Sequence, residues 1–355
     1  MNNRFAPTAL MLGNIVTGCS VLAPAGMLSE LSESLGVSIR TAGLLITFGA
    51  VVLCVGSAVT AWLTSRVERR TLLVATLAVL ALTNAASALA PDYAALLVIR
   101  LIMLAVGVIY TPQAAGTAAL VVPVEKRGWQ AVYGSIGAMG VLSSLLLVWR
   151  LPGRLRAAPV DLKTWIDLGR NRAIILLLSI TALQTSGQFT VFTFMGPLLK
   201  KLTDANPDAI GLVFALYGIA GFVGILIATR IVDSWCAYKT SLLFNALVMT
   251  GVTGWALSAG LYVLMAVAVA VWGLGFASTN SMQQVRLVAA APPLAPASVA
   301  LNTSVLYVGQ AVGSFVGGLF YARELLYGLG FVAMAFVALA VMLVIASQPR
   351  AVPAE

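Results

Sequence analysis

The sequence predicts an all-α membrane protein built of bundled transmembrane helices. Of its 355 residues, 60% are hydrophobic and only 9% are charged, whereas an average soluble domain has about a quarter charged residues. Apolar runs of about 20 residues, the length that crosses a bilayer as a helix, recur along the whole sequence. The alternating strands of about ten residues that build a membrane β-barrel are absent from the sequence.

Eleven apolar runs are candidate transmembrane helices, each bounded to within about four residues. They cover residues 8–28, 40–63, 71–90, 94–122, 130–149, 173–197, 208–230, 240–259, 261–283, 298–320 and 326–346. The first run is followed by Ala23-Pro24-Ala25, which resembles a signal-peptide cleavage site. We nevertheless assign it to a helix, because its length suffices to span and many further spans follow.

The basic residues predict how the chain is oriented. A net charge of +9 would indicate a nucleic-acid partner in a soluble protein, but no basic face with interleaved aromatic residues occurs here. The Lys and Arg residues instead cluster between apolar runs, as they do on the cytoplasmic side of membranes. We therefore expect a multi-pass protein of the cell inner membrane, with the lipid bilayer and no nucleic acid as partner. Both termini, the 64–70 and 231–239 loops and the 150–172 linker should be cytoplasmic.

The longest hydrophilic gap divides the chain into two helical halves. Residues 150–172 form a basic linker that includes Arg150, Arg154, Arg156, Lys163, Arg170 and Arg172. We expect an amino-terminal bundle of five apolar helices at 1–149 and a carboxy-terminal bundle of six at 173–355. In each half a basic residue followed by threonine opens the third helix, as Arg70-Thr71 and Lys239-Thr240. Duplicated helical halves are typical of transporters.

One span is missing from the first half when the two halves are compared. The second half has four spans, a loop near Arg286 and two more spans, whereas the first has four spans, the loop at 125–128 and only one more. Segment 130–149 also has basic residues at both ends, so a single crossing would place one basic cluster outside, against the usual charge distribution. The sequence therefore predicts that a span is absent directly after Gly128.

Two equivalent loops are similar to the signature of the major facilitator superfamily, G-x-L-x-D-R-x-G-R-R. Its positions in the first loop are Ala61, Leu63, Ser65, Arg66, Glu68, Arg69 and Arg70, so the arginines match, whereas serine replaces the aspartate and alanine and glutamate replace the glycines. In the second half Asp233 and Lys239 fall on the aspartate and the final basic position. Arg100 matches the family's fourth-helix arginine. Residues 123–128 resemble its P-x-E-K-R-G loop before helix five, and residues 129–133 resemble the start of helix six.

The chain thus resembles the drug:proton antiporter-1 branch of this superfamily, near its arabinose- and purine-efflux-like members. The resemblance implies a monomer with the major facilitator fold, two pseudo-repeated helical bundles that rock in alternating access. It also implies exchange of a small-molecule solute for protons. Members have twelve helices, whereas this chain has about 11 and lacks helix five. We expect Arg66, Arg69, Arg70 and Asp233, with Lys239 on the same motif, to form a cytoplasmic latch between the halves.

Polar residues inside the apolar runs are the candidates for a solute site. In the helices that the resemblance places around a central cavity, they are Asn14, Thr17, Arg100, Gln113, Gln184, Gln188, Asn280, Gln283 and Gln284. Hydrogen bonding between helices is the alternative role for each amide. Arg100 is the only charged residue within a predicted span that is not at its first or last position, and charge is costly there, so it should face a cavity or a partner. The alternative for Arg100 is that it snorkels to the membrane surface. Asn245 and Asn302 lie on helices expected to pack outside the cavity.

Other sequence features limit the chemistry. The chain lacks histidine and a GxxxxGK[ST] loop, so a Ser/His hydrolase and an ATP-driven pump are excluded. The three cysteines are isolated, and we expect no cofactor, metal or enzymatic activity. No acidic residue lies inside a predicted span, so proton coupling rests on the resemblance alone and uniport stays open. Gly309, Gly313 and Gly317 recur every four residues, a spacing that lets helices pack closely.

These observations predict a secondary transporter, an efflux permease that moves small polar or amphiphilic solutes by alternating access. The alternative is a non-transporting or impaired remnant of such a transporter, because of the missing helix.

Overall fold

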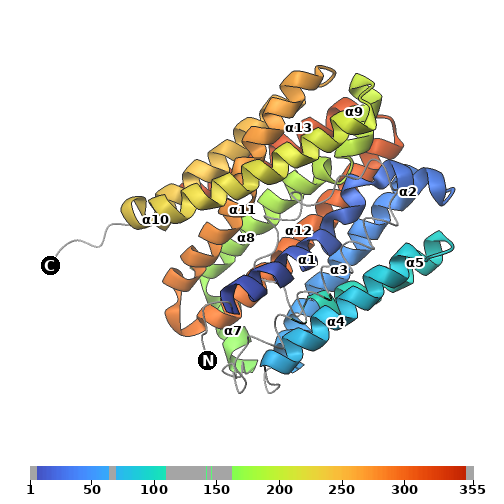
Figure 1. Ribbon diagram of the computed structural model, residues 1–355. Helices are drawn as coiled ribbons and strands as arrows, with labels where there is room; N and C mark the ends of the chain where they lie inside the picture. Colours follow the sequence, from blue (N-terminus) through green and yellow to red (C-terminus); the bar gives the residue numbers. More distant parts are fainter. Residues whose placement is uncertain (1–5, 64–68, 109–140, 142–144, 146–161, 349–355) are drawn as a thin grey trace.

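The computed structural model describes residues 6–63, 69–108, 141, 145 and 162–348. In these ranges the regular structure is helical throughout, and the long helices run side by side as a bundle (Figure 1). Seven of the described helices, with α10 counted once, are long and apolar enough to cross a membrane. The prediction of an all-α membrane protein is confirmed.

The first half follows the predicted apolar runs closely. Its described helices are α1 (Ala6–Gly26), α2 (Leu28–Ser34), α3 (Ile39–Leu63), α4 (Arg69–Ala88) and α5 (Tyr93–Gly107). Asp92 caps α5 by accepting a hydrogen bond from the Ala95 backbone N–H at 2.8 Å, which fixes where that helix begins. Apart from residues 141 and 145, segment 130–149 falls outside the described residues, as do the boundary at residue 149 and the span predicted to be missing after Gly128.

The second half contains the helices that build most of the cavity described below. They are α7 (Leu162–Arg170), α8 (Arg172–Phe192), α9 (Met195–Thr203), α10 (Pro207–Leu257), α11 (Tyr262–Ala290), α12 (Ala295–Ala322) and α13 (Leu326–Ala346), with a short 3-10 turn at Pro292–Leu294. Helix α7 lies within the predicted linker, and its Leu168 packs with Ile174 of α8 and Leu287 of α11. The part of the linker that is described is therefore a helix docked on the carboxy-terminal bundle.

Helix α10 is a hairpin of two spans. Its 51 residues would extend about 77 Å as one straight helix, more than twice the bilayer's hydrocarbon thickness. The backbone reverses at Cys236, which has a left-handed φ of 67°. Both arms pack on the same turn of α11, with Gly224 against Leu274 and Gly251 against Trp272. The two predicted runs at 208–230 and 240–259 are thus confirmed, with a tight turn between them.

The glycine stripe of α12 packs directly against the backbone of α8. A Cβ atom added at Gly309, Gly313 or Gly317 would lie 2.6, 2.3 or 2.4 Å from the carbonyl oxygens of Ala182, Ser186 and Thr190, respectively. Each step of four residues along α12 matches one turn of α8, so the two backbones approach over three successive turns. The close helix packing predicted from the spacing is confirmed.

The two halves meet at the end of the bundle where α1 ends and α3 begins. There the Phe194 ring occupies the space beside Gly43, where a Cβ atom would lie 2.9 Å away, and the Arg40 side chain lies beside Gly318. Phe194 also stacks on Tyr321, with the two ring centroids 5.4 Å apart. The start of α1, the α10 turn and α7 lie at the opposite end (Figure 1). Contacts between the halves therefore close the end that carries α2 and α9.

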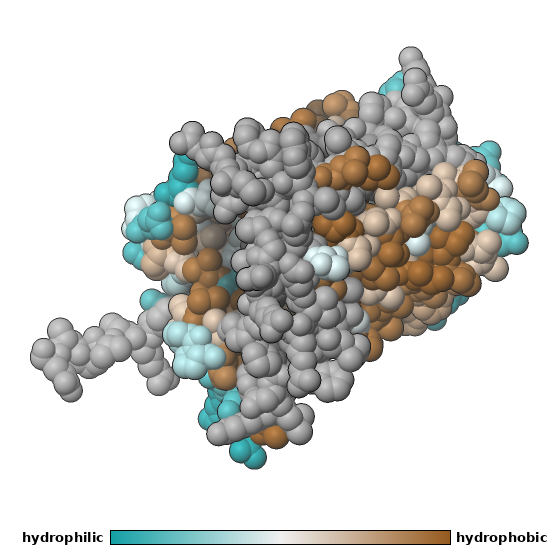
Figure 2. All heavy atoms as spheres, turned by 60° about the horizontal axis from the view of Figure 1, so that its bottom comes forward, coloured by the Kyte–Doolittle hydropathy of each residue, from teal (hydrophilic) through white to brown (hydrophobic). Residues whose placement is uncertain are grey.

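The outer surface of the bundle is apolar. Large hydrophobic side chains are exposed on both halves, among them Val55, Leu82, Leu257, Val263 and Met342. Figure 2 shows hydrophobic residues as broad continuous areas of the described surface. Such areas on a water-soluble protein would be unusually large, whereas a surface in contact with lipid tails requires them.

Candidate functional site

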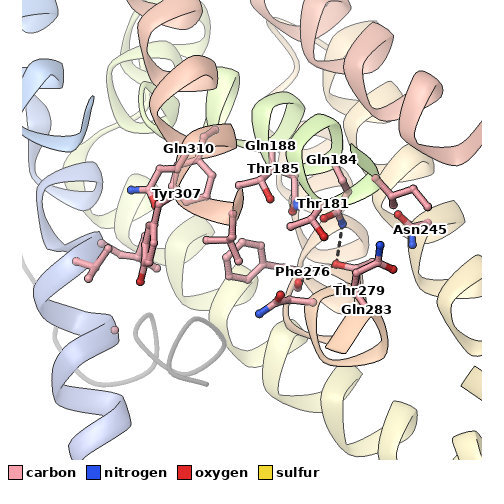
Figure 3. A pocket seen from close by; sticks show the side chains of 17 residues that line it. Thr181, Gln184, Thr185, Gln188, Asn245, Phe276, Thr279, Gln283, Tyr307 and Gln310 are labelled. Carbon is pink, nitrogen blue, oxygen red and sulfur yellow. Dashed lines mark hydrogen bonds between the residues drawn. The ribbon is translucent and has the colours of Figure 1, made fainter. Parts of the chain in front are cut away.

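A cavity lies between α1 of the first half and four helices of the second half. The empty space within it, including the part that opens to solvent, is about 690 Å³. Gly18, Val21 and Leu22 of α1 form one side, and residues of α8, α10, α11 and α12 form the rest (Figure 3). None of the described residues that line the cavity is charged.

The α8 side of the cavity carries the two predicted glutamines. Gln184 and Gln188 are four residues apart, so they lie on one face of the helix, and both are buried. Gln184 donates from Nε2 to the Thr279 hydroxyl at 2.6 Å. Gln188 accepts at Oε1 from the Trp272 indole N–H, also at 2.6 Å. Both glutamines line the cavity, one atom of each amide is held by α11, and their role in binding a solute stays a prediction.

The α11 side presents Phe276, Thr279, Asn280 and Gln283 to the cavity, at the spacing of three, four and seven residues that defines one helix face. Asn280, a predicted site residue, accepts a hydrogen bond from Asn302 Nδ2 at 3.0 Å. Gln283 donates to the Leu177 carbonyl oxygen. This face predicts cavity exposure for Gln283 rather than for the next residue.

Gln284 is accordingly not among the lining residues. One position along a helix rotates a side chain by about 100°, so adjacent glutamines cannot both face the same space. Of the two adjacent candidates, the structure places Gln283 in the lining and Gln284 outside it.

Arg100 lies in the bundle interior and does not line the cavity. Its side chain is 1% exposed. It donates from Nη1 to the Ser20 carbonyl at 2.9 Å, from Nη2 to the Val21 carbonyl at 2.7 Å and from Nε to the Leu45 carbonyl at 3.5 Å. The expectation that Arg100 faces a partner agrees with these contacts, and its burial excludes snorkelling: Arg100 joins α5 to α1 and α3.

The sequence of α1 explains why an arginine is needed there. Pro24 lies inside α1 and has no N–H, so it cannot donate to the carbonyl four residues earlier, which belongs to Ser20. A carbonyl left without a donor inside a membrane bundle is costly. Arg100 supplies the missing donor from a neighbouring helix.

The other predicted residues of the first half do not complete the described site. Thr17 is buried, donates to the Gly13 carbonyl at 2.9 Å and has its methyl group beside Gly107 of α5. It therefore contributes to helix packing, not to the cavity lining. Asn14 lies on α1, but its side chain is outside the described part of the chain, and Gln113 is outside it altogether.

Several lining residues were not predicted. Thr181, Thr185, Asn245, Tyr307 and Gln310 also line the cavity. The expectation that Asn245 packs outside it is wrong. Gln310 directly follows Gly309, which packs against α8. The close contact of the two helices at this turn places Gln310 beside the cavity. Asn302 behaves as expected for helix packing: its Oδ1 accepts from the Thr181 hydroxyl at 2.7 Å.

Arg286 is buried in the last turns of helix α11, which ends at Ala290, so the loop predicted near Arg286 follows it directly. It donates to the Ser241 hydroxyl and to Gln283 Oε1, each at 3.4 Å, and to the carbonyl and hydroxyl oxygens of Ser347. Its guanidinium also lies 5.5 Å from the Tyr238 ring centroid. Arg286 thus connects the cavity residue Gln283 to the end of α13.

The residues of the predicted latch are only partly described. Arg66 lies outside the described residues, and Arg69 and Arg70 begin α4 without described side chains. Asp233 and Lys239 are exposed on either side of the turn at Cys236. Their position at the end of the bundle opposite α2 and α9 agrees with the predicted loop, and the latch itself stays a prediction.

Comparisons with known proteins place the chain in one family. A family model described as "Major Facilitator Superfamily" matches residues 10–128, 124–293 and 177–354. The chain is 27% identical to the inner membrane transport protein YdhP of Escherichia coli K12, over 99% of each chain. It is 24% identical to the uncharacterized MFS-type transporter YbcL of Bacillus subtilis, over 99% of this chain and 98% of the relative.

This chain is 25% identical to a probable sugar efflux transporter of Helicobacter pylori 26695, in an alignment that covers 90% of this chain and 89% of the relative. Among solved structures, a bacterial homolog of the human lysosomal transporter Spinster, in an inward-facing and unoccupied conformation, shares the fold with a TM-score of 0.66. It covers 100% of both chains at 13% identity.

The alignment with YdhP extends over 388 positions, more than the 355 residues of this chain. The relative therefore has residues that this chain lacks, and the span predicted to be missing after Gly128 stays a prediction. Nothing in these comparisons supports the alternative of a non-transporting remnant. The match along nearly the whole sequence, the helical bundle and the cavity between its halves lead to one conclusion: the chain is a multi-pass transmembrane transporter that belongs to the Major Facilitator Superfamily.

Proposed function

We propose that this transporter exports small neutral solutes, polar or amphiphilic and including sugars, from the cytoplasm across the inner membrane. The observation that carries the proposal is the uncharged lining of the described cavity, which combines amides and hydroxyls with aromatic and aliphatic side chains. An ion bound in such a site would lose its hydration without gaining a counter-charge, which is costly. A neutral hydroxylated solute would instead exchange hydrogen bonds with water for hydrogen bonds with amides.

The aromatic residues support an amphiphilic or sugar-like solute. Phe189 and Phe276 line the cavity together with the amides, and a site of this kind uses apolar surface for burial and a few polar groups for orientation. The Helicobacter pylori relative carries the name of a sugar efflux transporter. Asn14 and Gln113 would add polar groups from the first half, as the sequence predicts.

The proposal includes orientation and energy source. With both termini and the basic loops in the cytoplasm, the end closed by Phe194, Gly43 and Gly318 faces outward. The loop residues Arg66, Arg69, Arg70, Asp233 and Lys239 would hold the opposite end in the alternate state. Proton exchange by a monomer is the coupling that we propose, with uniport as the alternative.

Transport by the purified protein in liposomes tests this function. Inside-out oriented protein should accumulate radiolabelled D-glucose or L-arabinose when the lumen is acidic, and a protonophore should abolish accumulation but leave equilibration. Gln184→Ala with Gln188→Ala should reduce the affinity about 5- to 150-fold, the cost of an unpaired buried amide.

Gln348→Ala is the matched control, because Gln348 is exposed beyond α13, and it should leave uptake unchanged. Uptake equal to that of empty liposomes would contradict the proposed function. Equal affinity in the double variant and the parent would show that both glutamines only form hydrogen bonds between helices. Equilibration that a protonophore and a pH gradient leave unchanged would favour uniport.

A further inference from the structure

Asn245 has a buried polar atom that no described residue satisfies. The side chain is 2% exposed and lines the cavity from the second arm of α10. Its Nδ2 donates to the carbonyl of Ser241, one turn earlier on the same helix, at 2.8 Å. Its Oδ1 is fully buried and has no hydrogen-bond partner among the described residues. An unpaired buried acceptor is rare in native proteins and calls for a functional explanation.

The orientation of the amide is determined by its surroundings. If the Asn245 amide were flipped, its oxygen would face the Ser241 carbonyl oxygen and the two acceptors would repel each other. The Ser241 hydroxyl also lies 3.4 Å from Nδ2 and receives a hydrogen bond from Arg286. The nitrogen therefore faces Ser241, and the oxygen is the atom left over.

The neighbouring amide nitrogens in the cavity bond to other groups. Gln184 Nε2 donates to the Thr279 hydroxyl and Gln283 Nε2 to the Leu177 carbonyl, whereas Gln283 Oε1 accepts from Arg286. Figure 3 shows Asn245 near this group of amides and hydroxyls, whereas Tyr307 and Gln310 lie on the other side of the cavity with Phe276 between them. No described residue pairs with the Asn245 oxygen, so it is available to a donor that enters the cavity.

We infer that Asn245 Oδ1 is the acceptor that selects a hydroxyl or amide N–H of the solute. This inference rests on the proposed function and names the specificity residue of that site. A site built to pair with a solute hydroxyl discriminates against the analogue that lacks it, because the buried protein atom is then left unpaired. One hydroxyl of a bound sugar should thus contribute much more to affinity than the others.

The experiment measures binding of D-glucose and its single-position deoxy analogues to the detergent-purified full chain by calorimetry. One deoxy analogue should bind the parent protein about 5- to 150-fold more weakly than glucose. In Asn245→Ala this difference should disappear, so that glucose and that analogue bind alike. Thr250→Val, which alters an exposed hydroxyl on the same helix arm, is the control and should retain the difference. Retention of the full difference in Asn245→Ala would overturn the inference.

A stability measurement on the empty protein tests the unpaired oxygen independently of any solute. Asn245→Leu should leave the melting temperature unchanged or raise it, because it removes an acceptor without a partner. Asn302→Leu should lower it, because Asn302 pairs with both Thr181 and Asn280. Equal losses in the two variants would show that the Asn245 oxygen has a protein partner, and the inference would fail. If the parent binds no sugar, the proposed function fails, and this measurement alone decides the inference about the oxygen.

Discussion

Each half of the transporter buries one arginine within its described helices, and the two are held in opposite ways. Arg100 donates to backbone carbonyls of α1 and α3, whereas Arg286 donates mainly to side chains, those of Ser241, Gln283 and Ser347. Backbone carbonyls of a helix cannot rotate away, but hydroxyls and amides can. We therefore expect the hydrogen bonds of Arg100 to hold its three helices in a fixed arrangement, and those of Arg286 to belong to a network that can rearrange.

The comparison predicts that replacing Arg100 has the largest effect on the stability of the protein. Arg100→Leu removes charge-assisted hydrogen bonds worth about 1.5–3 kcal/mol each and leaves the Ser20 carbonyl unpaired. We expect thermal unfolding in detergent to show a loss of about 3–5 kcal/mol in stability.

Pro24→Ala provides the test of the cause. An alanine N–H at position 24 could donate to the Ser20 carbonyl within α1, so the double variant Arg100→Leu, Pro24→Ala should lose less stability than the arginine variant alone. Additive losses would show that Arg100 does not compensate for the proline.

A second prediction concerns the close backbone contact between α8 and α12, which stabilises the second half. In Gly313→Ala the new methyl group would lie 2.3 Å from the Ser186 carbonyl oxygen, so α8 and α12 must separate. Overpacking of this kind costs about 1–3 kcal/mol. Gly211→Ala is the matched control, because no atom lies within 4 Å of its Cβ position, and it should leave the melting temperature unchanged or raise it. Equal losses from the two substitutions would mean that helix contact does not stabilise this half.

The smallest effect on stability is expected from Arg286→Gln. A neutral glutamine can still bond to Ser241 or Ser347, so the loss should be about 1 kcal/mol, the value of one ordinary hydrogen bond. Transport should fall by a larger factor than stability suggests, because Gln283 in the cavity loses its partner. Liposome uptake and thermal unfolding on the same preparation measure both. A destabilisation as large as that of Arg100→Leu would remove the distinction between the two arginines.

The sequence by itself determined the spans. Inside lipid each crossing segment must satisfy its own backbone, so apolar length alone locates helices such as α3, α8 and α13, and the tight turn at Cys236 follows from the short polar loop between two runs. The spacing of Gly309, Gly313 and Gly317 likewise predicted a close contact, because glycine permits it whatever the neighbouring helix is. The placement of Gln184, Gln188 and Asn280 came from the resemblance, which named the helices around the cavity.

Only the tertiary structure decided which way the remaining polar residues face. Asn245 and Gln310 line the cavity, whereas Thr17, Gln284 and Arg100 do not. In a soluble protein the polar face of a helix shows which side points to solvent. A helix in lipid is apolar on its outer side as well as on its packed side, so the periodicity that identifies a face is largely lost. The long reach of arginine adds a second reason: its donors satisfy carbonyls of other helices, here one that Pro24 had left without a partner, and no local pattern around Arg100 records that.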